Sequence, residues 1–153
     1  SKWLRNIADQ MHGNDAGRAQ RSFRIDMVIN LGMLRAGRDD EVLSEIRSVR
    51  VASRGKILKV IVETCLLTQE EKIRICEIVS RSGADFIKTS TGFSSGGARE
   101  TDILLFKKYI SPHLKIKAAG GIRTLEQAQR FLALGASRIG SSAIIPAVHN
   151  QLA

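Results

Sequence analysis

Four charged residues stand inside otherwise apolar segments of the sequence, and their side chains are the ones best suited to chemistry. Asp26 lies in "RIDMVIN", Lys59 in "ILKVIVE", Lys88 in "DFIKTS" and Lys117 in "LKIKAAG". Burying a charge is costly, so four charges in comparable segments favour a shared function. If the segments are neighbouring strands of one sheet, the alternation of side chains lets all three lysines face the same inner side.

The lysines point to amine chemistry. A lysine amine is nucleophilic only when it is deprotonated, and its ordinary pKa is about 10.4. A second ammonium group and partial removal from water both lower that pKa, so the neutral amine can form a Schiff base with a carbonyl group. Lys88 with Lys117 beside it fits this arrangement, and Asp26 could balance the charge and carry protons. The alternative is a structural network of ion pairs between Asp26 and the lysines, which would also perturb pKa values.

Five apolar segments are predicted to be the strands that position these residues. They cover 24–30, 57–63, 85–90, 114–120 and 137–143. Their nearly continuous apolar character predicts strands that are buried on both faces. The amphipathic segments between them, which predict helices, cover 39–55, 68–83, 96–110 and 124–135. This alternation at the length of a βα unit predicts a parallel α/β sheet.

Capping signals mark the ends of two of these helices. Thr68 and Thr124 are each followed three residues later by Glu or Gln, which is the pattern of a capping box. Gly83 and Gly135 stand where the helices should end, just before the next strand.

Glycine-rich loops after three of the strands suggest a phosphate site. The run Gly120-Gly121-Ile122-Arg123 leads into the helix that starts at Thr124. Exposed N–H groups at a helix start suit a phosphate, with the Arg123 side chain as a clamp. Gly140-Ser141-Ser142 follows the last strand in the same manner, and Thr91-Gly92 lies in the loop after Lys88. The alternative is ordinary turn formation by glycine.

Length and composition predict one α/β domain over residues 1–153. It would comprise an atypical N-terminal segment, 1–23, and five βα units in 24–153. Hydrophobic residues make up 43% and charged residues 25% of the sequence, as in an ordinary globular protein. No apolar run reaches the ~20 residues of a membrane span, and the first residues lack the apolar centre of a signal peptide, so a cytoplasmic location is expected.

Charge and cysteine content restrict the partners. The formal net charge is +9, but the basic residues are scattered and aromatic residues are only 5%, so we expect no nucleic-acid partner and no membrane partner. Cys65 and Cys76 are predicted to be reduced, with Cys76 in the core. The histidines, at positions 12, 113 and 149, are isolated from the strand ends, so no metal site is expected.

Several segments resemble the deoxyribose-phosphate aldolases, a family of class I (Schiff-base) aldolases on a (β/α)8 barrel. They are "GADFIKTSTGF", "KAAGGIRT", "LKVIVETCLLT", "IDMVINLG" and "RIGSSA", and the likeness runs from about Arg24 to Ala143. The pairing of "DFIKTSTG" with "KAAGGIRT" is highly specific. The resemblance implies reversible cleavage of 2-deoxy-D-ribose 5-phosphate to acetaldehyde and D-glyceraldehyde 3-phosphate, without a metal or organic cofactor.

The resemblance also implies roles for individual residues. Lys88 resembles the Schiff-base lysine, Lys117 the lysine that lowers its pKa, and Asp26 the acid of the proton relay. The residues that fall where the family holds the substrate phosphate are Gly92, Gly120, Gly121, Gly140, Ser141 and Ser142, and Lys59, Thr91 and Arg123 are further candidates for binding the substrate or its phosphate.

The chain departs from the family in length. A barrel of this type has eight βα units in about 250 residues, whereas the likeness here begins at the fourth strand and covers five. Five strands cannot close such a barrel, so we expect an incomplete one. A partner could complete it, two copies could pair their open sheet edges to form a homo-oligomer, or the units could relax into an open flavodoxin-like sheet. A functional alternative is an impaired aldolase remnant that binds a phosphate group or a protein.

Overall fold

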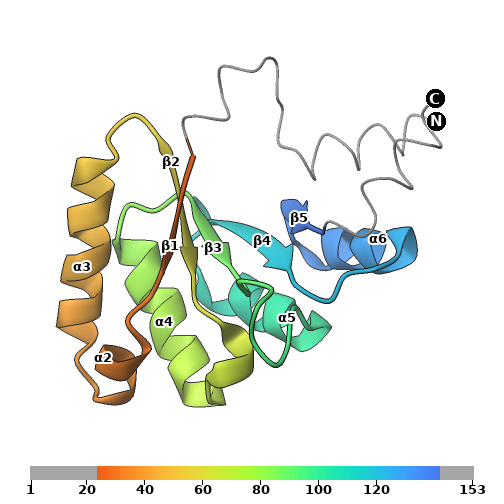
Figure 1. Cartoon of the computed structure of the whole chain (residues 1–153), viewed down its shortest axis with the longest axis horizontal. Helices are drawn as coiled ribbons and strands as arrows, with labels where there is room; N and C mark the ends of the chain where they lie inside the picture. The colour runs from red at the N-terminus through yellow and green to blue at the C-terminus, as the bar shows by residue number, and fades with distance from the viewer. Residues whose placement is uncertain (1–23, 142–153) are drawn as a thin grey trace.

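The computed structural model describes residues 24–141, which form a sheet of five parallel strands alternating with helices (Figure 1). The strands lie in chain order as β1 (Arg24–Val28), β2 (Ile57–Ile61), β3 (Phe86–Lys88), β4 (Lys115–Ala119) and β5 (Arg138–Gly140). The helices are α2 (Leu31–Arg35), α3 (Asp39–Ala52), α4 (Gln69–Arg81), α5 (Glu100–Tyr109) and α6 (Leu125–Leu134). The predicted fold class, an incomplete barrel of alternating strands and helices, is confirmed.

The strand order places the main helices on one side of the sheet. Each strand pairs with the next one in the chain. Because each connection is a right-handed crossover to the next strand on the same side, the connecting helices all lie on one face of the sheet. Figure 1 shows α3, α4, α5 and α6 following one another in this way. Along this part of the chain, residues 24–141, no helix is long and apolar enough to cross a membrane.

The two faces of the sheet differ in character. Side chains such as Leu58, Ile87 and Ile139 have no exposed surface and form the core with the helices. The opposite face carries charged residues, and Val28 on that face is 51% exposed. The expectation of strands buried on both faces is therefore wrong for the strand that contains Val28, because the described chain places no layer over that end of the inner face.

The predicted caps of α4 and α6 are confirmed, whereas the segments predicted as helices at 39–55 and 96–110 are helical over Asp39–Ala52 and Glu100–Tyr109. Thr68 and Thr124 form the capping boxes expected of them, with Glu71 and Gln127 as their partners. Gly135 ends α6 with φ 123, a backbone conformation that favours glycine because it has no Cβ atom.

Two short elements were not predicted. Helix α2 follows β1 directly, and its first N–H groups are capped by Asn30, whose Oδ1 atom accepts a hydrogen bond from the Met33 nitrogen at 3.0 Å. A 3-10 helix, η2 (Thr64–Leu66), follows β2. Elements of three to five residues are too short to show a helical period in the sequence.

Ion pairs join each outer helix to the next. The pairs are Asp39 with Arg74 between α3 and α4, Lys72 with Asp102 at 2.7 Å between α4 and α5, and Glu100 with Arg130 at 3.1 Å between α5 and α6. Asp102 is almost completely buried. These pairs fix the spacing of the helices that support the strands.

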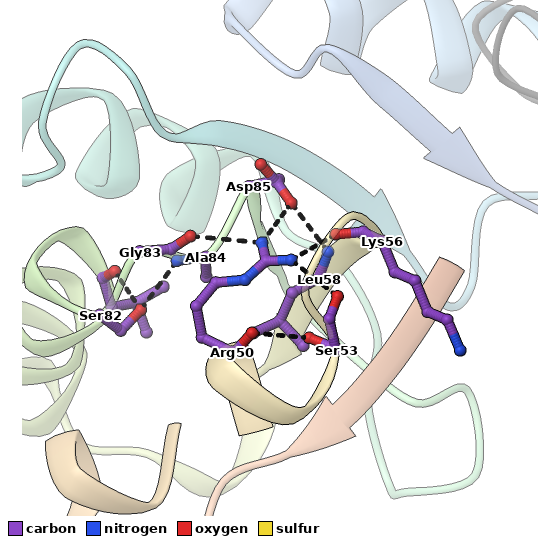
Figure 2. A network of polar contacts seen from close by, with 9 residues as sticks. Arg50, Ser53, Lys56, Leu58, Ser82, Gly83, Ala84 and Asp85 are labelled. Carbon is purple, nitrogen blue, oxygen red and sulfur yellow. Dashed lines mark hydrogen bonds and ion pairs between the residues drawn. The ribbon is translucent and has the colours of Figure 1, made fainter. Parts of the chain in front are cut away.

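Arg50 organises the amino ends of β2 and β3 (Figure 2). Its guanidinium group donates to the Asp85 carboxylate at 2.8 Å and to the carbonyl oxygens of Gly83, Ser53 and Lys56. The same Asp85 oxygen accepts from the Leu58 nitrogen at 2.8 Å. One arginine at the end of α3 thus ties together the turns that lead into two strands.

The two cysteines are free thiols, and Cys76 belongs to the core as predicted. Burial raises the pKa of the Cys76 thiol to about 12. Cys65 lies half-buried in η2. The atypical N-terminal segment, 1–23, and the histidines at positions 12 and 149 lie outside the described residues.

Candidate active site

The register of the sheet brings the four charged strand residues to one face. Asp26 on β1 is opposite Lys59 on β2, and Lys88 on β3 is opposite Lys117 on β4. Lys59 and Lys88 share a face because the residue opposite Lys88 is Ile61, two positions beyond Lys59. Strands lie about 4.8 Å apart, so these residues form one polar group on the inner face of β1 to β4.

The Asp26 carboxylate binds two of the lysines. Its Oδ1 atom lies 3.1 Å from Lys59 Nζ, and its Oδ2 atom lies 3.0 Å from Lys88 Nζ. Burial by itself would raise the pKa of Asp26, but the hydrogen bonds and charges of Lys88 and Lys59 outweigh it and hold that pKa below 3.8. Asp26 is therefore an ionised acceptor near neutral pH.

The surroundings of Lys117 shift its pKa. Burial, together with repulsion from Lys59 and Lys88, lowers the pKa of Lys117 to about 8, against the weaker opposing effect of Asp26. Gly140 on β5 leaves room for the Lys117 side chain. A residue with a Cβ atom at position 140 would place that atom 3.2 Å from Lys117 Cε. A substantial fraction of Lys117 is thus neutral at slightly alkaline pH.

A pocket of about 410 Å³ opens beside Lys88 at the carboxyl ends of β3, β4 and β5. It is lined by Lys88, Thr91, Gly92, Phe93, Ala119, Gly120, Gly121, Ile122, Arg123, Gly140 and Ser141. The lining includes most of the residues predicted to bind the substrate. Asp26, Lys59 and Lys117 do not line this pocket, and Ser142 lies outside the described residues.

A larger groove of about 660 Å³ lies on the outer surface of α3, with Arg47 and Arg81 on its walls. It is on the helical side of the sheet, away from the charged inner face. Its size therefore does not make it a better candidate for lysine chemistry than the smaller pocket.

The start of α6 differs from the expected phosphate cradle. The Gln127 side chain accepts hydrogen bonds from the N–H groups of Arg123 and Thr124, at 2.8 and 3.2 Å. Those two donors are thus used within the protein. An anion in the pocket would instead face the Gly120-Gly121 backbone, which has φ 85 and 72, and the exposed Arg123 side chain.

Glu63 is a residue of the site region for which the sequence suggested no role. It follows β2, is only 7% exposed, and accepts hydrogen bonds from the backbone and the hydroxyl group of Thr91. The available signal was a carboxylate directly after the buried strand "ILKVIV". Nothing in the sequence identified Thr91 as its partner, because the two residues are 28 positions apart.

Comparison with known proteins agrees with this geometry. The family described as DeoC/LacD family aldolase matches residues 19–143. A deoxyribose-phosphate aldolase of Streptococcus agalactiae is 58% identical over 127 residues, which cover 83% of this chain and 57% of that protein. The chain thus spans little more than half the length of this relative.

Solved structures give the same assignment. The structure titled "QR15, an Aldolase" superimposes with a TM-score of 0.80 and 38% identity over 85% of this chain and 59% of that one. A tetrameric deoxyribose phosphate aldolase of Aeropyrum pernix has a TM-score of 0.74 and 25% identity over 86% of this chain and 56% of that one. The lysine-rich strands, the pocket at their carboxyl ends and these matches together place the chain in the DeoC/LacD family of aldolases.

Proposed function

We propose that this chain carries the catalytic lysines of an aldolase that cleaves 2-deoxy-D-ribose 5-phosphate to acetaldehyde and D-glyceraldehyde 3-phosphate. The observation that carries the proposal is the arrangement around Lys88. Its amine borders the pocket and is bound to Asp26 at 3.0 Å, and its strand neighbour Lys117 has a pKa of about 8. This is the environment that Schiff-base chemistry needs.

Position decides between the two lysines. Lys88 lines the pocket and Lys117 does not, so Lys88 is the amine that can reach a bound carbonyl group. Lys117, half-buried on the neighbouring strand, serves as the proton acceptor. When Lys117 is neutral it can take a proton from the Lys88 ammonium group, which leaves Lys88 as the free amine.

The reaction then follows from the electron demand of the imine. Lys88 Nζ adds to C1 of the open-chain sugar, and the loss of water gives a protonated imine. A basic group removes the proton of the C3 hydroxyl, the C2–C3 bond breaks, and its electron pair moves toward the imine to form an enamine. Release of D-glyceraldehyde 3-phosphate, protonation of C2 and hydrolysis return acetaldehyde and the free lysine. Asp26 was expected to be the acid of the proton relay, but its two ion pairs favour the charged form, so in this proposal it stays ionised and holds Lys88 in place.

The glycine loops suit the phosphate group of the sugar. Gly92, Gly120, Gly121, Gly140 and Ser141 line the pocket together with Arg123. Backbone N–H groups and one guanidinium group favour a dianion. Within this proposal Thr91 and Ser142 belong to the same loops, and Lys59 acts through its ion pair with Asp26.

An assay of sugar cleavage tests the proposal. Purified protein should release acetaldehyde from 2-deoxyribose 5-phosphate, and Lys88→Met should abolish the release. Lys56→Met is the matched control, because this lysine is exposed and lies at the opposite end of the strands. Cleavage by Lys88→Met at the parental rate would refute the assignment of Lys88, and an inactive parent that still binds phosphate would favour the remnant alternative.

A further inference from the structure

The residue that follows β2 has an unusual backbone conformation. Glu63 has φ 55 and ψ 65, and among residues 24–141 it is the one non-glycine residue with a positive φ. A side chain with a Cβ atom is strained in this left-handed region. The side chain is nevertheless buried, so contacts of its carboxylate compensate for the strain.

Those contacts all lead to one residue of the loop after β3. Thr91 Oγ1 donates to Glu63 Oε2 at 2.6 Å, and the Thr91 nitrogen lies 3.2 and 3.4 Å from the two carboxylate oxygens. The same Oγ1 atom accepts from the Phe93 nitrogen at 3.1 Å. Hydrogen bonds to a carboxylate are stronger than those between neutral groups, so Glu63 anchors the Thr91–Phe93 backbone through the threonine hydroxyl.

The far end of this loop is held in a different way. A Cβ atom on Gly96 would lie 2.9 Å from Cys65 Cβ, and one on Gly97 would lie 2.2 Å from the Gly120 oxygen. The Ala98 nitrogen donates to the Ala119 oxygen at 3.0 Å. Close packing therefore fixes the distal half, whereas Glu63 supplies the side-chain acceptor that holds Thr91.

We infer that Glu63 is a positioning residue that sets the Thr91–Phe93 backbone against the substrate phosphate. The inference rests on the proposed function, because it takes the pocket lined by Gly92 as the phosphate site. Glu63 does not line the pocket and its carboxylate is occupied by Thr91, so it acts through the loop and takes no part in the bond-breaking step. A carboxylate suits this task because it accepts from two donors of one residue at once.

The competing explanation is that Glu63 merely occupies a sharp turn. Glu63→Gly separates the two, because glycine adopts the left-handed conformation without strain but has no carboxylate. Glu63→Gln keeps one acceptor oxygen and should show an intermediate effect. Glu77→Ala is the control, since Glu77 is an exposed residue in the middle of α4.

Amide hydrogen exchange of the loop tests the anchoring directly and needs no enzymatic activity. Glu63→Gly should speed the exchange of the Thr91 and Phe93 amides by about tenfold or more, while Glu77→Ala matches the parent. Parental exchange in Glu63→Gly would overturn the inference. If Glu63→Gly does not fold, Glu63→Gln replaces the charged acceptor by an amide and must speed the exchange of the Thr91 amide, and parental exchange in that variant would overturn the inference.

Kinetics test the link to the phosphate. In Glu63→Gly the KM for 2-deoxyribose 5-phosphate should rise about tenfold with kcat within about twofold, and kcat/KM for unphosphorylated 2-deoxyribose should not change. Glu63→Gln should restore part of the KM. An equal loss of kcat for both sugars would overturn the positioning role. If the parent cleaves neither sugar, the proposed function fails, while the exchange experiment still decides whether Glu63 anchors the loop.

Discussion

At the scale of single residues, the site is governed by how three lysines share one aspartate. Asp26 contacts Lys59 and Lys88 through separate oxygens, so each of these ammonium groups has a counter-ion. Lys117 faces the same cluster, but burial and repulsion from Lys59 and Lys88 dominate its electrostatics. Its pKa therefore falls to about 8. Lys117 is therefore a weak base, and its neighbour Lys88 is an amine that Asp26 holds in position. This arrangement suits proton transfer between the two lysines.

The lowered pKa of Lys117 predicts how stability depends on pH. The ordinary pKa of 10.5 applies to the unfolded chain, which binds more protons than the folded one between about pH 8 and 10.5. The Lys117 contribution is therefore unfavourable below pH 8 and is relieved as the pH rises through this window. Lys117→Met should stabilise the fold at pH 7 by about 1–2 kcal/mol, after allowance for solvent screening, and should do so less at pH 10.

Urea unfolding at the two pH values measures this difference. Lys115→Met is the control on the same strand, because Lys115 is exposed. A stabilisation by Lys117→Met that is the same at both pH values would show that its pKa is ordinary in the folded protein.

At the scale of elements, Arg50 shows how a helix positions the strands that carry the site. Arg50→Met removes the contacts to Asp85 and to three carbonyl oxygens, and leaves the Asp85 carboxylate with the Leu58 nitrogen but without its ion-pair partner. Because Asp85 is partly exposed, we expect a loss of about 1–3 kcal/mol in the free energy of unfolding.

A surface arginine provides the comparison. Arg38 makes a pair with Glu41 at 3.6 Å, and both side chains are more than half exposed. Arg38→Met should change stability by less than about 0.5 kcal/mol. Equal shifts of the urea midpoint for both variants would contradict the structural role of Arg50.

The elements also show what the sequence could and could not reveal. The apolar strands, the amphipathic helices and the two capping boxes depend on local pattern, and they were predicted with small errors at their ends. The pairing of Glu63 with Thr91 joins two loops that are far apart in the sequence, which no local pattern encodes. The contact of Gln127 with the Arg123 nitrogen spans four residues and accompanies the capping box that was predicted at Thr124. The face on which Lys59, Lys88 and Lys117 meet was predictable because alternation along a strand is geometric.

At the scale of the whole molecule, the sheet formed by residues 24–141 is open at β1. The Ile29 nitrogen donates to β2, so the Val28 nitrogen, one residue earlier, faces the other edge. An edge with unpaired backbone groups tends to associate with another strand. The sequence could predict that five strands leave a barrel open, but it could not predict what lies against the edge, because that depends on residues beyond this sheet.

We therefore expect copies of this chain to associate through β1. Light scattering should give a multiple of the 16.8 kDa chain mass. Val28→Pro removes an outward-facing N–H group without removing a bond to β2, so it should shift the protein toward the monomer. Val51→Lys, on the exposed surface of α3, is the control. A parent that is monomeric at high micromolar concentration would contradict association through this edge.

The central claim is that Lys88 forms a Schiff base while Lys117 accepts its proton, and reductive trapping tests it most directly. Acetaldehyde with borohydride should attach a single ethyl group to the peptide that contains Lys88, leave exposed Lys56 unlabelled, and label more as the pH rises through about 8. Lys117→Met should reduce the labelling at neutral pH. Labelling of Lys88→Met as strong as that of the parent would contradict the account.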